Sequence, residues 1–432
     1  MDTIPRSAPD DAPRRGDQGK KTPAAIARHG RLKAGGAVAT VMKVLAATLA
    51  VALVSGASVA TIALWDVTSS VKPPVHLVSE KTAGPIPQIG AIDGGVNLLL
   101  VGSDSRQGQD PMFGTGADAE GVLNDVTMLL HISQDHKNAT VVSFPRDMYV
   151  RIPSCPDPKG GSFSAMSSQK INTTLTYGGL PCTVETVAQL TGLDIQFAAL
   201  IQFSGVIAMS NAVGGVPVCV ADKIEDRYTN TFLDPGMHTL SGVAALQFLR
   251  TRHGVGDGSD LGRISNQQVF LSSLVRTIKS SDTLANPVRL YALAKAAVNN
   301  MVLSDSLHNI DRMVQIALAL KDIDLDKVVF IQYPTGASGN GVKPITDAAD
   351  ALTAALKADQ PVVLSGGTAP GDIGSVVQTP TPTPVAPSTP GIVATPTPAA
   401  SATAAPTVLP DAVTGQTAAQ NTCSKGRTLN NQ

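Results

Sequence analysis

The sequence predicts an α/β domain, in which helices cover a central sheet, preceded by one membrane-spanning helix. Three observations carry this prediction. Short apolar runs alternate with amphipathic stretches between about residues 91 and 362, which is typical of layered α/β domains. No charged residue interrupts the segment from Val44 to Trp65. The chain beyond residue 362 is dominated by Pro, Thr and Ala and has little apolar surface to bury.

Residues 1–43 are predicted to form a disordered cytoplasmic tail, because they are polar, contain Pro and show no apolar period. Residues 44–65 form the predicted transmembrane helix, since at ~1.5 Å per residue they are long enough to cross a hydrocarbon core. Nine Lys or Arg against four Asp lie in residues 1–43, so the N-terminus is expected in the cytoplasm and the rest of the chain outside the cell membrane. A cleaved signal peptide is the alternative: small residues at 58–61 suit cleavage, although its apolar stretch is normally shorter, about 7–15 residues.

Residues 66–90 contain Pro, Gly and Lys and are expected to form a linker to the domain at 91–362. Within the domain, strands are predicted at the short apolar runs: 96–102, 126–132, 139–144, 198–202, 216–220 and 328–333. Helices are predicted where apolar residues recur every three or four positions: 183–190, 203–213, 241–252, 264–279, 287–298, 307–320 and 345–357.

Residues 363–432 are predicted to form an extended or disordered extracytoplasmic tail. All four cysteines follow the predicted span, where thiols tend to pair, and their spacing fits no zinc site. Cys155 and Cys182 bracket a loop rich in Gly, Ser and Pro, which favours a disulfide between them. A bond between Cys219 and Cys423 follows by elimination only, and the sequence establishes neither bond.

Charged residues gather at the ends of the predicted strands. Overall, 33 basic residues balance 34 acidic ones, which argues against a nucleic-acid partner. Asp104 and Arg106 follow one strand, Asp125 begins the next, and Arg146 and Asp147 follow the third. Open α/β sheets place ligands at strand ends, and carboxylates beside guanidinium groups suit a divalent cation with a phosphate. A capped turn and a plain ion-pair cluster are the alternative interpretations.

Further basic residues lie at predicted helix ends. Lys170 precedes a helical stretch, where a lysine opposes the helix dipole unless an anion binds there; a solvated lysine is the alternative. Arg250 and Arg252 are two residues apart and cannot share a helix face, so both are expected to reach one pocket from the end of a helix. Arg263 opens the next predicted helix, where a bound anion would offset the unfavourable dipole.

Together these segments resemble the LytR-CpsA-Psr family in its actinobacterial form. The resemblance rests on NLLLVGSDSR, DVTMLLHIS, VVSFPRD, KIN, ALQFLRTRH and GSDLGRISNQQ, which follow the order and spacing of the family over nearly all of residues 91–280. It implies a single extracytoplasmic catalytic domain with a central mixed sheet flanked by helices. It also implies a pocket that holds the head group of a polyprenyl diphosphate with Mg²⁺ or Mn²⁺, and an apolar groove for the lipid tail.

The resemblance also implies roles for individual residues. Asp104 and Asp125 would bind the metal, Asp147 would orient Arg146, and Gln267 would support the phosphates. The positive groups that face the diphosphate would be Arg146, Lys170, Arg250, Arg252 and Arg263. Two positions depart from the family pattern, since Leu123 and Asn266 stand where many members carry an arginine. Arg106 is expected to bind substrate and to compensate for Leu123.

The activity that the resemblance implies is phosphotransfer. A glycopolymer would move from a polyprenyl diphosphate carrier to a hydroxyl of peptidoglycan, with release of polyprenyl phosphate. The same residues leave two alternatives open: a polyprenyl diphosphate pyrophosphatase, and a non-catalytic scaffold of the cell envelope that binds lipid diphosphate. The sequence does not indicate which polymer is transferred, which group is the general base, or the oligomeric state.

Overall fold

The computed structural model describes residues 37–69, 73–77, 94–106, 109, 111–113, 122–279, 296–365, 374–377 and 406–432. Several predictions concern residues outside these ranges: the cytoplasmic tail up to residue 36, most of the linker at 66–90, and residues 366–373 and 378–405 of the C-terminal tail. The chain divides into two units, residues 1–63 and 64–432, and each is described by itself.

Helix α1 (Ala37–Ser69) contains the predicted transmembrane segment at 44–65. Within the part of the chain that the structure describes, no helix is both long and apolar enough to cross a bilayer. The membrane span therefore stays a prediction.

The second unit is built on a seven-stranded mixed sheet, ordered β13-β8-β1-β2-β3-β14-β20. Its strands are β1 (Val96–Ser103), β2 (Asn124–Ile132), β3 (Ala139–Phe144), β8 (Phe197–Ile201), β13 (Met301–Leu303), β14 (Val328–Gln332) and β20 (Thr414–Thr417). The pairs β1–β8 and β3–β14 are parallel, whereas β1–β2, β2–β3, β8–β13 and β14–β20 are antiparallel. The predicted central mixed sheet is confirmed, and the predicted strands agree within one or two residues.

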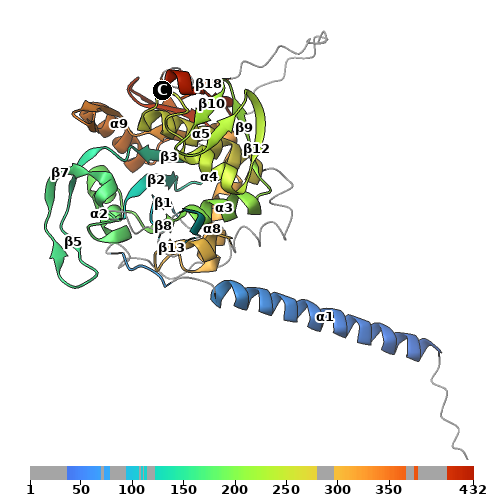
Figure 1. Cartoon of the computed structure of the whole chain (residues 1–432). Helices are drawn as coiled ribbons and strands as arrows, with labels where there is room; N and C mark the ends of the chain where they lie inside the picture. The colour runs from blue at the N-terminus through green and yellow to red at the C-terminus, as the bar shows by residue number, and fades with distance from the viewer. Residues whose placement is uncertain are drawn as a thin grey trace, which may run out of the picture. The chain divides into compact units, whose positions relative to one another are not determined.

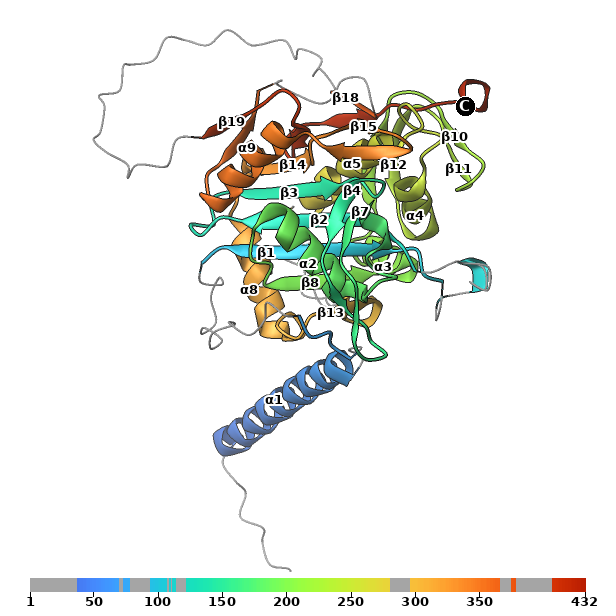
Figure 2. The same cartoon turned by 90° about the vertical axis from the view of Figure 1, so that its left-hand side faces the viewer.

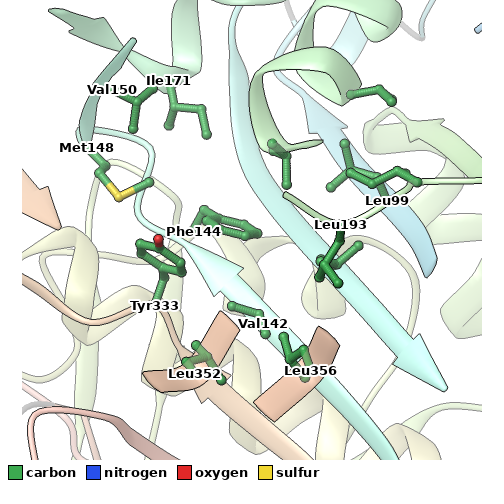
Figure 3. Close-up of a cluster of buried hydrophobic side chains, with 14 of the residues drawn as sticks. Leu99, Val142, Phe144, Met148, Val150, Ile171, Leu193, Tyr333, Leu352 and Leu356 are labelled. Atoms are coloured by element: carbon green, nitrogen blue, oxygen red, sulfur yellow. The ribbon is translucent and has the colours of Figure 1, made fainter. Parts of the chain in front are cut away.

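Helices cover both faces of this sheet, because side chains alternate between the faces along each strand. Leu99 and Val142 face the side covered by α2 (Gly179–Thr191) and α9 (Thr346–Lys357), as Figure 3 shows for part of this core. Leu98 and Leu100 face the side that packs against α5 (Asp260–Lys279) and α8 (Ile310–Lys321). In Figure 1 the sheet is seen between these two helical layers.

Helices α3 (Phe203–Ala212) and α4 (Gly242–Arg250) pack against each other on the α5 side. Each predicted helix overlaps an observed one, except that most of 287–298 lies outside the described residues. Helix α5 starts at Asp260, four residues before the predicted start at Ile264. The earlier start is physically reasonable, because the carboxylate in the first turn is favourable to the helix dipole.

Short strands extend the domain beyond the sheet. The hairpins pair β4 (Tyr149–Ile152) with β7 (Met166–Lys170), β5 (Cys155–Pro156) with β6 (Ser162–Phe163), β10 (Ile224–Asp226) with β11 (Thr231–Leu233), and β15 (Thr335–Ser338) with β16 (Gly341–Pro344). A disulfide joins Cys155 to Cys182 and so fastens β5 to α2. This bond is the pair that the sequence favoured.

The C-terminal segment is part of the fold from Thr407 onward. Strand β19 (Thr407–Leu409) pairs with β17 (Val362–Leu364), and β20 extends the central sheet. Strand β21 (Thr422–Ser424) joins β9 (Val216–Val220), β12 (Gly236–Leu240) and β18 (Ser375–Val377) in a four-stranded sheet. The disulfide between Cys219 and Cys423 fixes this position. The predicted tail, residues 363–432, thus includes strands of the domain, which were too short to give a periodic signal.

Candidate active site

Three strand ends meet at one edge of the sheet. Ser103, the last residue of β1, pairs with Asn124 at the start of β2, and Phe144 at the end of β3 pairs with Thr127. The residues that follow or begin these strands, Asp104 and Asp125 among them, are therefore brought to the same edge. The antiparallel register explains how charged residues from three separate segments gather in one place.

Asp104 and Asp125 form a carboxylate pair at this edge. The Leu123 amide donates to Asp104 Oδ1 at 2.9 Å, and the Asp104 amide donates to the Leu123 carbonyl at 3.2 Å. Burial raises the pKa of Asp104, and the negative charge of Asp125 raises it further, which outweighs the hydrogen bond from Leu123. The two carboxylates are thus close enough to repel each other, and a cation between them would relieve that repulsion.

Arg146 links two of the acids. Its Nη1 lies 2.5 Å from Asp125 Oδ1, and its Nε lies 3.4 Å from Asp147 Oδ2. Burial alone would lower the pKa of Arg146, but Asp125 and the neighbouring acids raise it above its ordinary value. Asp147 also accepts from Lys170 Nζ at 2.9 Å. Burial acts to raise the pKa of Asp147, but the hydrogen bonds and charges of Lys170 and Arg146 lower it below its ordinary value.

Asp260, in the first turn of α5, ties this cluster to the helix. Its Oδ2 accepts from the Arg146 backbone amide at 3.0 Å, and its Oδ1 lies 2.5 Å from Arg263 Nη2. The same Arg263 nitrogen donates to the Asp125 carbonyl at 2.8 Å. Arg263 is buried, so it is fixed beside Asp125 by both contacts. Asp260 therefore sets the positions of two of the predicted phosphate-binding arginines.

Arg250, at the end of α4, carries a positive charge with no acidic partner among the described residues. Its guanidinium carbon lies 4.3 Å from the centroid of the Phe203 ring. Burial lowers the pKa of Arg250; Asp125 and Asp104 raise it, while Arg106 and Arg263 lower it again. The positive charges of Arg106 and Arg263 therefore repel that of Arg250. A bound anion would remove that repulsion.

Asp226, which the sequence interpretation missed, organises the segment that follows α4. Its Oδ2 accepts from the Thr251 hydroxyl at 2.7 Å and from the Arg252 amide at 3.2 Å. Its Oδ1 accepts from the Tyr228 amide at 2.9 Å. Burial acts to raise the pKa of Asp226, but these hydrogen bonds lower it below its ordinary value. A single acid in a short hairpin has no spacing that could have indicated this role.

Gln267 and Asn266 are consecutive residues of α5 but form hydrogen bonds with different partners. Gln267 Nε2 donates to the Leu249 carbonyl at 3.1 Å, at the end of α4. Asn266 is fully buried; it donates to the Phe248 carbonyl at 2.7 Å and accepts from the Ser424 hydroxyl at 2.5 Å. Asn266 therefore connects α4 to the C-terminal strand and is not among the residues that line the cavity beside Gln267.

A cavity of about 460 Å³ joins this charged edge to the apolar interior. Its charged end is lined by Asp125, Arg146, Arg250, Arg252, Arg263 and Gln267. Most of its other lining residues are apolar and come from the sheet, α3, α4 and α5, including Leu100, Met128, Val206, Met209, Leu246, Leu249, Phe270, Leu271, Leu274 and Met301. Figure 2 shows α3 and α4 near the same end of the sheet. The shape suits a molecule with an anionic head and a long apolar tail.

The predicted site residues divide into two groups. Asp125, Arg146, Arg250, Arg252, Arg263 and Gln267 line the cavity. Asp104, Asp147 and Arg106 stand behind or beside these residues through the contacts given above. Lys170 instead reaches Asp147 and the Asn340 carbonyl. Besides Asp226 and Asp260, the prediction omitted Phe203, whose position at the start of an apolar helix is typical of a core residue.

The residues present are compatible with a magnesium ion. Within the described residues, no group of three or more His, Cys, Asp or Glu is arranged to hold a metal. Mg²⁺, however, is commonly bound by one or two carboxylates together with substrate phosphates and water. Asp104 and Asp125, whose like charges lie together beside the arginines, supply that number of carboxylates.

Comparison with known proteins identifies the family of this chain. The model of the LytR_cpsA_psr family matches residues 68–358. The chain is similar to "Probable cell wall biosynthesis protein LcpB" of Corynebacterium glutamicum, with 35% identity over 243 residues, which are 55% of this chain and 55% of the relative. It is also similar to "Polyisoprenyl-teichoic acid--peptidoglycan teichoic acid transferase TagT" of Bacillus subtilis, with 27% identity over 252 residues, 56% of this chain and 72% of the relative.

The match to LcpB thus spans about half the length of that relative. Among solved structures, the "LytR-Csp2A-Psr enzyme from Actinomyces oris" aligns with 66% of this chain and 96% of its own, at 20% identity and a TM-score of 0.49.

Proposed function

The chain belongs to the LytR_cpsA_psr family, and we propose that it is a phosphotransferase that attaches a glycopolymer to peptidoglycan. The donor is a polyprenyl diphosphate that carries the polymer, the acceptor is a hydroxyl of peptidoglycan, and polyprenyl phosphate is released. The names of the relatives support this proposal, since one denotes cell wall biosynthesis and another the transfer of polyisoprenyl-linked teichoic acid to peptidoglycan. We further propose that residues 44–65 anchor the chain in the cell membrane, with the domain outside.

One observation carries the proposal: a single cavity has a cationic end and an apolar end. A diphosphate needs guanidinium groups, which bind its oxygens through a planar fork. A polyprenyl chain needs apolar walls shielded from water. The cavity offers both kinds of wall within one space, which supports a lipid diphosphate as its ligand.

In this mechanism the chain works by positioning and charge neutralisation, as is usual in phosphoryl transfer. The acceptor hydroxyl loses its proton to solvent as its oxygen bonds to the phosphorus that bears the glycan, and the bond from that phosphorus to the departing polyprenyl phosphate breaks. Arg250, Arg252 and Arg263 hold the diphosphate oxygens and stabilise the negative charge that develops on the leaving phosphate. Asp125 and Asp260 keep Arg146 and Arg263 in place. Mg²⁺ held by Asp104 and Asp125 would add positive charge at the same oxygens.

Lipid binding is tested on the full-length chain. We expect mass spectrometry of extracted lipids to show a copurifying polyprenyl phosphate or diphosphate in the wild type and little in Arg250→Ala. Arg151→Ala is the matched control, because Arg151 is exposed on β4 and does not line the cavity. Equal lipid content in the two variants would contradict the proposed site.

Transfer itself is tested with a polyprenyl diphosphate-linked glycan, supplied with and without peptidoglycan. We expect polyprenyl phosphate release to depend on peptidoglycan, with the polymer recovered in the wall fraction. Release at the same rate without peptidoglycan would identify a pyrophosphatase instead. Lipid binding without any release would identify a scaffold.

A further inference from the structure

Two aromatic rings lie at the rim of the cavity and are not used by the proposed mechanism. Tyr228 and His253 stack with ring centroids 4.5 Å apart and planes inclined by 39°. Both residues line the cavity. Tyr228 is nevertheless 80% exposed, so much of its ring is open to solvent. An exposed aromatic ring thus lies beside the arginines that line the cavity.

Asp226 holds the backbone segments that carry the two rings. Its Oδ1 accepts from the amides of Tyr228 and Thr229, at 2.9 and 3.3 Å, within the turn between β10 and β11. Its Oδ2 accepts from the Arg252 amide at 3.2 Å, one residue before His253. One buried carboxylate therefore orders the turn that carries Tyr228 and the loop that carries His253.

The pair also lies beside the group that would hold the diphosphate. Arg252 and His253 are consecutive residues, and both line the cavity. In a diphosphate-linked glycan the first sugar is bonded directly to the phosphate. A phosphate held by Arg252 would thus bring an attached sugar ring next to His253 and Tyr228.

We propose that Tyr228 and His253 form a platform that binds a pyranose ring at the mouth of the cavity. The proposal rests on the proposed function, whose donor and acceptor both carry sugars. The negative face of an aromatic ring attracts the polarised C–H groups on the face of a pyranose, and the tyrosine hydroxyl offers a polar tip at the ring edge. The ring comes from the phosphate-linked sugar of the donor or from the acceptor glycan. The platform selects substrate, whereas the arginines bind any prenyl diphosphate.

The test compares two soluble ligands by isothermal titration of the full-length chain in detergent. One is a short prenyl diphosphate, and the other is the same diphosphate bearing N-acetylglucosamine. We expect the sugar to tighten binding in the wild type by about threefold to tenfold, the range typical of aromatic contacts. Tyr228→Ala and His253→Ala should each reduce this gain and leave affinity for the sugar-free ligand unchanged. Tyr228→Phe should keep most of the gain, because it retains the ring face and loses only the hydroxyl.

Phe232→Ala is the matched control, because Phe232 is 51% exposed on the same hairpin and does not line the cavity. It should behave as the wild type. Chitotetraose, titrated with and without the sugar-free diphosphate, distinguishes the source of the ring. If Tyr228→Ala weakens only chitotetraose binding, the platform holds the acceptor.

The platform is refuted if Tyr228→Ala changes neither the donor gain nor chitotetraose binding. It is also refuted if the variant changes only cosedimentation with phosphatidylglycerol vesicles, since the ring would then be a membrane contact. Failure of the proposed function looks different: the wild type would bind neither prenyl diphosphate. The chitotetraose titration without diphosphate still decides the question in that case.

Discussion

Asn266→Ala is expected to lower the free energy of unfolding more than an ordinary polar substitution, although Asn266 touches no predicted substrate group. The side chain is fully buried and joins two segments. Its amide nitrogen donates to the Phe248 carbonyl in the last turn of α4, and its oxygen accepts from the Ser424 hydroxyl in β21. Alanine would leave both partners buried without this contact. Helix carbonyls in a last turn have no other intrahelical donor.

The size of the destabilisation follows from the two groups that lose their hydrogen-bond partner, the Phe248 carbonyl and the Ser424 hydroxyl. Each buried polar group left without a partner costs about 1–3 kcal/mol, so Asn266→Ala, which leaves two such groups, should destabilise the chain by about 2–6 kcal/mol. Ser424→Ala leaves only the Asn266 oxygen without a partner and should cost about 1–3 kcal/mol. Because the residues are in direct contact, the double variant should fall short of the sum by about 1 kcal/mol.

The assay is urea unfolding, monitored by circular dichroism, of the wild type, the two single variants and the double variant. The dependence of unfolding free energy on urea concentration is compared among them to verify that their unfolded states are alike. Asn266→Arg provides a second check, because a guanidinium in this buried site loses hydration and meets only a carbonyl and a hydroxyl. It should destabilise more than Asn266→Ala and gain no affinity for prenyl diphosphate. Tighter diphosphate binding by Asn266→Arg, without loss of stability, would show that position 266 faces the cavity after all.

Four further outcomes are expected. Hydrogen bonds lower the pKa of Asp226 below its ordinary value of 3.8. The Asp226 carboxylate therefore stabilises the folded chain above that pH, and this stabilisation is lost as the pH falls through the folded pKa. The difference in unfolding free energy between wild type and Asp226→Asn, measured by urea titration, should thus shrink below pH 3.8. Replacing Cys219 and Cys423 by Ser should cost about 2–4 kcal/mol in the same assay under oxidising conditions, since the bond closes a separation of 204 residues. Asp260→Ala removes the acceptor of Arg263 and should lower kcat/KM for transfer by about 100-fold in steady-state kinetics, whereas an unchanged value would exclude a positioning role. EDTA should slow transfer more than about tenfold without releasing the copurified lipid, and simultaneous loss of lipid would indicate that the metal holds the ligand.

The sequence predicted the central sheet well, because its strands are long enough to show apolar runs. Val96–Ser103 and Ala139–Phe144, for example, are buried over most of their length and stand between turn residues. Strands of two or three residues, such as Cys155–Pro156 and Thr422–Ser424, offer no such period. They form because a disulfide and neighbouring strands supply the stabilisation, and these long-range contacts leave no local trace in the chain.

The charged residues of the site could be predicted for a similar reason. Asp104, Asp125 and Arg146 lie where strands begin or end, so topology alone brings them to one edge. Lys170 was expected to face the diphosphate, and in the structure its amine donates a hydrogen bond to Asp147. The choice of this partner depends on side-chain packing, which residue spacing does not reveal. Phe203 was equally hidden, since a ring beneath Arg250 and a ring in the core look alike in sequence.

The site also depends on residues that never reach the cavity. The loop with Arg252 and His253 is held on one side by Asp226. On the other side the C-terminal segment holds it through backbone hydrogen bonds: the Gly256 amide donates to the Lys425 carbonyl at 2.8 Å, and the Arg427 amide donates to the Gly254 carbonyl at 2.8 Å. A cationic loop needs such support, because neighbouring guanidinium groups repel one another and would otherwise move apart when no anion is bound. The energy that keeps the arginines converged therefore comes from the scaffold, and the last residues of the chain are part of the site in that physical sense.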